Sequence, residues 1–232
     1  MGEMISIPRA GASFGAYVAR PDTAKAPGLI VIQEIFGVNQ VMRDLTDEFA
    51  RQGFLAVCPD LFWRVEPGID ITDKTEAEWK RAFELYNAFD VDKGVKDIGA
   101  TIAHVRGDPG CSGPIGSVGF CLGGLLSFLA ATRTDIDATV SYYGVGIEQR
   151  LREADALVTP VLLHIAEEDS FTPKPAQTLI IEALKNRSLA EIFTYPGRDH
   201  AFARPGGEHY DEADAERAMG RTLAFFRGRL TR

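Results

Sequence analysis

One cysteine of the chain stands where an apolar run changes into a helical pattern. Cys121 lies in the segment Gly-Phe-Cys-Leu-Gly-Gly at 119–124, after the apolar run that starts at residue 115. Glycines two positions before and after a nucleophile relieve crowding on a sharp turn from strand to helix. Such a turn aims the helix amino terminus at the thiol, which favours the thiolate, and aims the Leu122 amide at a developing oxyanion. We therefore predict that Cys121 is a nucleophile, and the alternative is a small buried core residue.

A candidate acid and a candidate base follow two later strands of the chain. Asp169 comes after the apolar run 161–165, and His200 comes after the run 191–195. The order nucleophile, acid, histidine is the one found with a nucleophile on this kind of turn. His200 can take the thiol proton through one ring nitrogen while Asp169 holds the other. Glu167 and Glu168 share the loop of Asp169 and remain rivals for the acid.

The other three histidines occupy positions that favour a structural role. His104 lies inside a helical pattern, His164 lies inside a strand pattern, and His209 lies in a polar loop. A packed or hydrogen-bonded imidazole is the usual outcome inside a helix or strand. His200 is therefore the predicted base by context and by elimination.

The segments that must position these residues alternate between two patterns. Near-continuous apolar runs predict strands at 28–33, 54–58, 115–120, 138–143, 161–165 and 191–195, after an opening antiparallel pair at 4–7 and 15–19. Helical spacing predicts helices at 41–52, 75–88, 91–106, 122–132, 175–186 and 211–230. This alternation predicts one α/β domain over residues 1–232, with a mainly parallel sheet covered by helices on both faces. Sites in such sheets form at the carboxyl ends of the strands, where Glu34, Cys121, Asp169 and His200 stand.

Composition excludes several classes of partner. The chain has 25 basic and 33 acidic residues and a net charge of −8, so we expect neither a nucleic-acid nor a membrane partner. Three cysteines are an odd number without a C-x-x-C pair, so we expect neither a disulfide framework nor a metal site. We recognise no export signal and no apolar run of membrane-spanning length, and we expect a cytoplasmic protein.

With these residues in place, the chain resembles the dienelactone hydrolase family, of the α/β-hydrolase superfamily, over nearly its whole length. The matching motifs are Gln-Glu-Ile-Phe-Gly at 33–37, Asn-Ala-Phe-Asp at 87–90, Gly-Phe-Cys-Leu-Gly-Gly at 119–124, Tyr-Tyr-Gly-Val-Gly at 142–146 and His-Ala-Phe-Ala-Arg at 200–204. The first and third motifs together are specific for this family, whereas neither motif alone is specific. The resemblance implies hydrolysis of a cyclic enol-lactone, 4-carboxymethylenebut-2-en-4-olide, to maleylacetate in the degradation of aromatic compounds, without a metal or organic cofactor.

The resemblance also implies roles for residues that spacing alone does not reach. Glu34 would contact the resting thiol and, once displaced by substrate, help to form the thiolate. The Ile35 amide would be the second oxyanion donor. Arg204 would bind a substrate carboxylate through its two parallel donors, although an exposed loop arginine is the alternative. Among the aromatic residues that could line the pocket we name Phe36, which has the strongest positional argument, and Tyr142.

Three positions depart from the family pattern, all of them in substrate recognition. The family's upstream arginine aligns with Trp79, so Arg81, Lys80 or neither could replace it. A frequent serine after the histidine is Ala201 here, and a usual tyrosine on the upstream helix is Phe83. The reaction class is therefore a firmer prediction than the substrate.

The sequence thus predicts a hydrolase, a monomer with a small lactone or ester substrate, that works by acyl transfer to Cys121. One alternative is a hydrolase of another small lactone, ester or thioester, which the departures at Trp79 and Ala201 favour. A further alternative, from another functional class, is a non-catalytic ligand-binding or thiol-sensing protein that keeps the fold.

Overall fold

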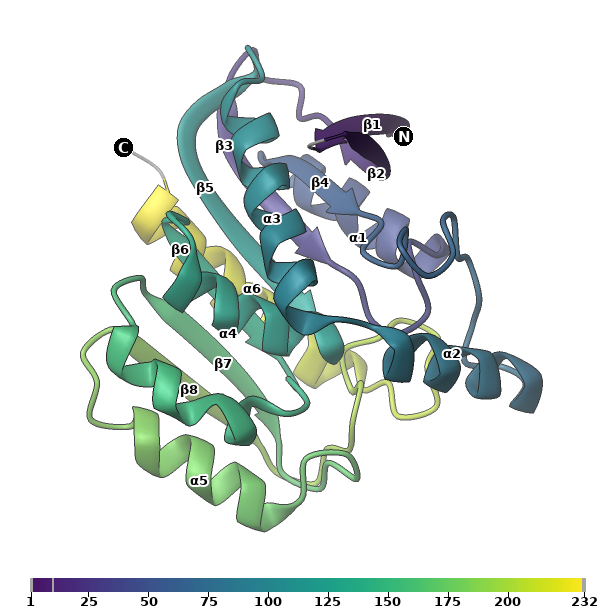
Figure 1. Ribbon diagram of the computed structural model, residues 1–232. Coiled ribbons are helices and arrows are strands. Elements are labelled where there is room, and N and C mark those ends of the chain that lie inside the picture. The colour runs from purple at the N-terminus through teal and green to yellow at the C-terminus, as the bar shows by residue number, and fades with distance from the viewer. Residues whose placement is uncertain (1, 10, 231–232) are drawn as a thin grey trace. The chain divides into compact units, whose positions relative to one another are not determined.

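The computed structural model describes residues 2–9 and 11–230 of the chain (Figure 1). The chain divides into two compact units, Met1–Ile115 and Gly116–Arg232. The elements of the first unit are, in chain order, β1 (Glu3–Arg9), β2 (Ala12–Ala19), β3 (Ala26–Ile32), α1 (Gln40–Arg51), β4 (Leu55–Pro59), α2 (Glu76–Ala88) and α3 (Val91–Arg106). The boundary between the units falls within β5 (Cys111–Phe120).

Strands of the first unit are ordered β1-β2-β4-β3. The pairs β1–β2 and β2–β4 are antiparallel, and β3 pairs with β4 in parallel, so the predicted opening pair is confirmed. A Cβ on Gly28 of β3 would meet the side chain of Val105, so α3 covers this face. Gly28 aligns with Leu55 of β4, and Cys58, three residues further along β4, faces the other way and meets Thr46 of α1. The helices α1 and α3 therefore cover opposite faces.

Side-chain caps set where the helices of the first unit begin. Asn39, Thr75 and Asp90 each accept a hydrogen bond from a backbone amide in the first turn of α1, α2 and α3. Such caps satisfy amides that have no partner within the helix. The predicted helix starts therefore rest on local chemistry that the sequence displays.

The second unit holds the remaining elements. They are the end of β5, α4 (Leu122–Arg133), β6 (Ala138–Tyr142), the 3₁₀ helix η1 (Ile147–Ala156), β7 (Val161–Ala166), α5 (Lys174–Leu184), β8 (Ala190–Tyr195) and α6 (Glu212–Leu230). The strands β5-β6-β7-β8 lie side by side and all pair in parallel. The helix η1 is the one element here that the sequence patterns did not predict.

Two glycines of β5 show that helices cover both faces of this sheet. A Cβ on Gly116 would meet Phe226 and Leu230 of α6, and a Cβ on Gly119 would meet Ser127 of α4. Residues three apart on a strand face opposite sides, so α4 and α6 lie on opposite faces (Figure 1). The chain therefore has the predicted α/β fold with mainly parallel strands, and the prediction of one domain over 1–232 stays a prediction.

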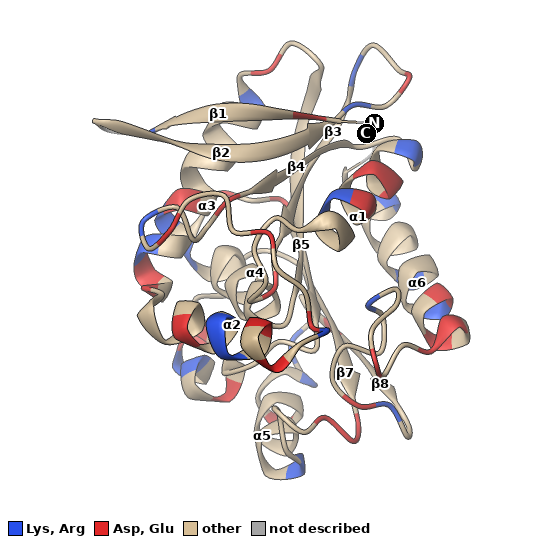
Figure 2. Cartoon of the chain, turned by 90° about the vertical axis from the view of Figure 1, so that its right-hand side faces the viewer, with Lys and Arg blue, Asp and Glu red and all other residues tan. Residues whose placement is uncertain are grey.

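Charged side chains gather on helices and loops, while β3 and β5 carry none (Figure 2). Strands without charge suit a sheet that is buried on both faces. Among residues 2–9 and 11–230, every helix is too short or too polar to traverse a lipid bilayer.

Candidate active site

The turn from β5 into α4 has the geometry that the glycine spacing predicts. Cys121 has φ 54° and ψ −115°, a conformation that L-residues rarely adopt, and it is 7 % exposed. A Cβ on Gly119 would lie 1.9 Å from the carbonyl oxygen of Gly123, so strand and helix touch here with no room for a side chain. Backbone strain of this kind costs about 1–3 kcal/mol and persists only where its surroundings hold it.

Backbone hydrogen bonds from neighbouring segments hold the turn in place. The amide of Cys121 donates to the carbonyl of Tyr142, at the end of β6, over 3.1 Å. The Cys121 carbonyl accepts from Gly124 at 2.9 Å and from Val145 at 3.3 Å. Leu122 begins α4 directly after Cys121 and is 1 % exposed. The strained residue is therefore fixed from both β6 and the loop after it.

Asp169 and His200 are brought together from the loops that follow β7 and β8. His200 Nδ1 lies 3.1 Å from Oδ1 and 3.0 Å from Oδ2 of Asp169, and both residues are almost fully buried. Asp169 Oδ1 also accepts from the amides of Phe171 at 2.8 Å and Thr172 at 3.0 Å. These donors fix the orientation of the carboxylate toward the imidazole.

The two rival acids of the same loop differ from Asp169 in their contacts. Glu168 is exposed, and its carboxylate forms an ion pair with Lys174 at 3.0 Å. Glu167 is half-buried and its amide donates to the carbonyl of Tyr195. Only Asp169 among the three has a carboxylate oxygen hydrogen-bonded to His200.

Cys121 is coupled to His200 by charge. Burial alone lowers the pKa of His200, but the negative charge of Cys121 and the hydrogen bond to Asp169 raise it to about 10. Among the described residues, His200 Nε2 has no hydrogen-bond partner of good geometry. Nδ1 is occupied by Asp169, so Nε2 is the nitrogen that is available to exchange a proton with a reacting group.

Two aromatic rings pack against the imidazole. The ring centre of Tyr143 lies 5.0 Å and that of Phe171 lies 4.8 Å from the His200 ring, both edge to face. Tyr143 has φ 38° and Ala201, directly after the histidine, has φ 62°. Apolar walls of this kind reduce access of water and strengthen the charge interactions of the pair. Tyr143 was not predicted, although strand alternation would have set it on the face opposite to Tyr142.

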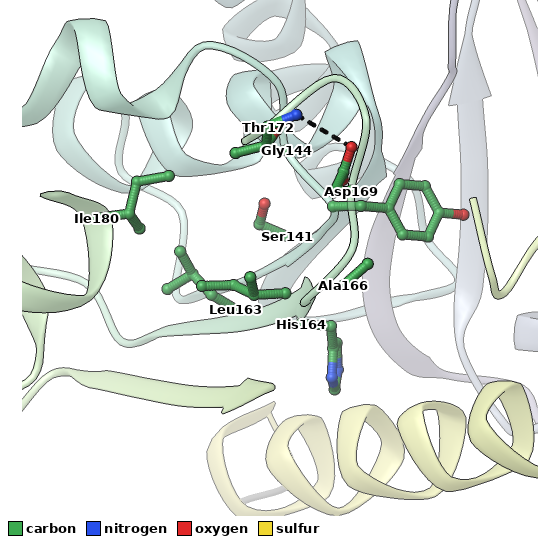
Figure 3. A pocket seen from close by; sticks show the side chains of 10 residues that line it. Ser141, Gly144, Leu163, His164, Ala166, Asp169, Thr172 and Ile180 are labelled. Atoms are coloured by element: carbon green, nitrogen blue, oxygen red, sulfur yellow. Dashed lines mark hydrogen bonds between the residues drawn. The ribbon is translucent and has the colours of Figure 1, made fainter. Parts of the chain in front are cut away.

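A small cavity of about 10 Å³ lies beside Asp169 (Figure 3). Its lining includes Ser141 and Thr172, whose buried hydroxyls have no hydrogen-bond partner among the described residues. Figure 3 shows the Ser141 hydroxyl pointing toward the space between Leu163, Ile180 and Asp169. A cavity of this size accommodates a single water molecule at most and is far below the volume of a substrate pocket.

Tyr142 and Arg204, two residues with a predicted role in substrate binding, are both buried. The Tyr142 hydroxyl hydrogen-bonds to Thr222 of α6 at 2.7 Å, and burial raises its pKa. Its ring packs against His164, so the side chain belongs to the interior between sheet and α6. Arg204 is 7 % exposed, which excludes the alternative of an exposed loop arginine. Buried arginines are almost always paired.

The other predicted site residues belong to the first unit. Glu34, Ile35 and Phe36 directly follow β3 and are 3 %, 6 % and 2 % exposed, so Glu34 is a buried carboxyl. Phe36 packs edge to face against Trp79 at 5.1 Å between ring centres. Gln33 anchors the segment by accepting from the amide of Leu61 at 3.0 Å. The roles predicted for Glu34, Ile35 and Phe36 in the chemistry of Cys121 stay predictions.

Arg81 is engaged in ion pairs. Its guanidinium binds Glu66 and also Glu84, the latter at 3.0 Å. Lys80 is exposed, and Trp79 stacks on Phe83 at 5.7 Å. The question of which residue replaces the family's upstream arginine stays open, but two carboxylates already neutralise the charge of Arg81.

Residues 2–9 and 11–230 contain no group of three or more His, Cys, Asp or Glu side chains that could hold a metal ion.

Comparison with known proteins identifies the family to which the chain belongs. The model of the dienelactone hydrolase family matches residues 14–230. A protein of Azospirillum brasilense is 51% identical over 97% of this chain and 98% of its own length, and the carboxymethylenebutenolidase of Pseudomonas putida is 40% identical over 93% and 91%. A solved structure from Klebsiella pneumoniae, named for dienelactone hydrolase, has a TM-score of 0.83 and 30% identity, covering 97% of this chain and 98% of that one. The chain therefore belongs to the dienelactone hydrolase family and is a hydrolase that acts on ester or lactone bonds.

Proposed function

We propose that this hydrolase opens a dienelactone, 4-carboxymethylenebut-2-en-4-olide, to maleylacetate, with Cys121 as the nucleophile. The observation that most supports this proposal is the buried Asp169–His200 pair. The charge of Cys121 raises the pKa of the imidazole in this pair. Relatives that carry the name carboxymethylenebutenolidase support the choice of lactone. We place the reaction in the degradation of aromatic compounds, with a small molecule as the partner and a monomer as the working form.

The reaction proceeds through two acyl transfers. The Cys121 thiolate attacks the lactone carbonyl, and the new carbon–sulfur bond leaves a negative oxygen that the Leu122 amide stabilises. The ring carbon–oxygen bond then breaks and expels an enolate, which takes the Nε2 proton of the His200 imidazolium to become the ketone and leaves His200 neutral. An enolate is a good leaving group, so a thiolate suffices for this lactone where it would be poor on an amide.

The second half returns the enzyme to its starting state. His200 takes a proton from water through Nε2, and the resulting hydroxide attacks the thioester carbonyl. The carbon–sulfur bond breaks, the thiolate of Cys121 is regenerated, and the acid leaves. Asp169 stabilises the imidazolium that forms and holds its Nδ1–H.

The test uses dienelactone as the substrate and measures maleylacetate by NMR. Cys121→Ala is expected to abolish turnover, whereas Cys111→Ala, which removes another unpaired and accessible thiol, is expected to keep it. Mass spectrometry of the quenched wild-type enzyme is expected to find an acyl group on Cys121. Full turnover by C121A contradicts the mechanism.

A second candidate is a hydrolase of another small lactone, ester or thioester. The observation that favours it is the engagement of Arg81 with Glu66 and Glu84, which leaves Arg204 to bind a substrate carboxylate alone. Arg204→Gln should lower kcat/KM for dienelactone roughly 10- to 100-fold, the effect of one hydrogen bond to a charged group, and lower it far less for a neutral aryl ester. Equal losses on both substrates, with higher wild-type rates on the neutral ester, favour the second candidate.

A non-catalytic thiol-sensing or ligand-binding role is excluded by the same assays if dienelactone or the aryl ester is hydrolysed in a Cys121-dependent manner. Labelling of Cys121 by iodoacetamide with no hydrolysis of any ester, lactone or thioester favours it instead.

A further inference from the structure

One carboxylate oxygen connects the two loops that carry Asp169 and His200. Oδ1 of Asp199 accepts from the amide of Ser170 at 2.8 Å and from the amide of His200 at 2.6 Å. Ser170 directly follows Asp169, so a single atom joins the neighbour of the acid to the base itself. Nothing in the mechanism above uses Asp199.

A backbone hydrogen bond completes this connection on the other side of Asp169. The amide of Glu168 donates to the carbonyl of Arg198 at 2.8 Å. Both neighbours of Asp169 are thus tied to the two residues that precede His200. Loops are mobile unless their backbone is anchored. These hydrogen bonds anchor both loops directly beside the contact between Asp169 and His200.

The electrostatics of Asp199 fit an acceptor of strong hydrogen bonds. Partial burial alone would raise the pKa of Asp199, but the amides of His200 and Ser170 outweigh it and hold the pKa below its ordinary value. His209 Nε2 lies 3.7 Å from the other oxygen, Oδ2. The carboxylate remains negative at neutral pH, and hydrogen bonds from backbone amides to a charged oxygen are short and strong.

We propose that Asp199 is a positioning residue, whose Oδ1 holds the two loops in register so that His200 Nδ1 stays against Asp169. A catalytic contact must be held within about 0.5 Å of its productive geometry, which two surface loops achieve only when they are joined. The proposal rests on the function proposed for Cys121, Asp169 and His200. The positioning depends on the location of the acceptor oxygen, and the charge strengthens its two hydrogen bonds.

Three substitutions separate the acceptor from the charge. Asp199→Asn keeps an oxygen at the same distance from the backbone and loses the charge. Asp199→Glu keeps the charge and moves the oxygen by one methylene, and Asp199→Ala loses both. Glu168→Ala is the matched control, because it removes a carboxylate next to Asp169 whose ion pair is with the exposed Lys174.

We expect kcat to fall in D199A and D199E by about 10- to 100-fold, the cost of a misplacement near 1 Å, with KM little changed. E168A is expected to stay close to wild type, and D199N is expected to lose less than D199A or D199E, because its neutral oxygen still accepts both hydrogen bonds, although more weakly. A charge-based role for Asp199 predicts the reverse order, with D199E active and D199N impaired. That order, or equal kcat values for D199A and E168A, overturns the proposal.

Two readouts need no substrate, so their failure is distinct from a wrong choice of lactone. The rate of Cys121 alkylation by iodoacetamide against pH reports the ionisation of the Cys121–His200 pair, and it should shift in D199A and D199E alone. The low-field proton NMR signal of a His200 Nδ1–H bonded to Asp169 should be lost in the same two variants and retained in D199N. Unchanged profiles and signals in D199A contradict the proposal.

A double-mutant cycle with Asp169→Asn separates positioning from general stability. If Asp199 acts through the contact of Asp169 with His200, D199A should add little to the alkylation shift of D169N. Fully additive effects assign Asp199 a merely structural role. D199E replaces D199A in the cycle if thermal unfolding shows that D199A does not fold.

Discussion

The carbonyl oxygen of Gly123 occupies the space that a side chain at Gly119 would need, 1.9 Å from the ideal Cβ position. Real Cβ atoms do not approach backbone atoms this closely, so any other residue forces β5 and α4 apart at Cys121. The two glycines therefore set the geometry of the turn as well as relieving crowding.

Gly119→Ala is expected to abolish both the activity and the alkylation of Cys121 by iodoacetamide. It should also lower the free energy of unfolding by about 1–3 kcal/mol or more through overpacking. The matched control is Gly220→Ala in α6, where a Cβ would meet nothing within 4 Å. That variant should be stabilised by about 0.5–1 kcal/mol, because a helix interior favours alanine over glycine. Urea unfolding of both variants checks the prediction, and a folded, active G119A contradicts it.

Asp169→Asn should leave the fold intact and lower kcat by about a hundredfold or more, because the imidazolium loses its negative partner. The hydrogen bond and charge of Asp169 both raise the pKa of His200, so this pKa should fall in the variant. The pH profile of Cys121 alkylation measures the shift. Glu168→Gln, one residue earlier, is the control and should match wild type, and a D169N profile that also matches wild type rules out the pairing.

The candidate nucleophile and the candidate base could be singled out from the sequence because each depends on local pattern. An apolar run followed by a glycine-flanked Cys121, or by a loop containing His200, reports a strand end, and parallel strands bring their ends to one edge. His164 was likewise expected to be a packed or hydrogen-bonded imidazole, and its two nitrogens bind Tyr195 and Thr222.

The remaining features depend on contacts between distant segments. The sequence favoured Asp169 but could not exclude Glu167 or Glu168, because the choice depends on which side chain the tertiary structure turns toward His200. The ion pair of Arg81 with Glu66 joins residues 15 positions apart and leaves no periodic signal. Asp199 stood beside the predicted base without a visible role, since its partner Ser170 belongs to another loop.

Alkaline pH should destabilise the protein through His200. Its pKa is about 10 in the folded state and near 6.5 for an unperturbed histidine, so between these values the His200 side chain binds more proton in the folded state than in the unfolded chain. The contribution of His200 to the free energy of unfolding therefore falls as pH rises from 6.5 toward 10. Cys121→Ala removes the charge that raises this pKa and should reduce the slope. Denaturant unfolding of wild type and C121A at several pH values checks this, and parallel curves contradict it.

Acidic pH should destabilise the protein through His164, with the opposite sign. Burial, assisted by the charge of Arg221, lowers the pKa of His164 to about 3. The imidazole is hydrogen-bonded by Tyr195 at 2.7 Å and Thr222 at 3.0 Å. Between pH 6.5 and 3 the unfolded chain binds a proton that the folded state does not, so the free energy of unfolding falls as pH falls.

His164→Gln removes the titrating ring and should flatten this acid dependence, although it is less stable than wild type at neutral pH. Unfolding in urea at pH 7, 5 and 4 compares the two proteins. His104→Gln, on α3, is the control and should keep the wild-type slope. An unchanged slope in H164Q means that another group causes the acid dependence.

Asp97 of α3 binds side chains from two other segments of the first unit. Its carboxylate is fully buried and accepts from Arg9 of β1 at 3.0 Å, from Trp63 at 3.0 Å and from Arg64. Arg64 also lies 4.2 Å over the Trp63 ring. A buried carboxylate is tolerated only with donors of this kind, and its removal leaves those donors without a partner.

Asp97→Ala should therefore lower the free energy of unfolding by about 3 kcal/mol, the lower end for a broken buried ion pair, because both arginines are partly exposed and recover some hydration. Asp97→Asn should cost less, since an amide oxygen still accepts from Trp63. Asp22→Ala, an exposed acid of the same unit, is the control and should change stability little. Tryptophan fluorescence during urea unfolding follows the cluster directly through Trp63, and a D97A midpoint equal to that of D22A contradicts the assigned structural role.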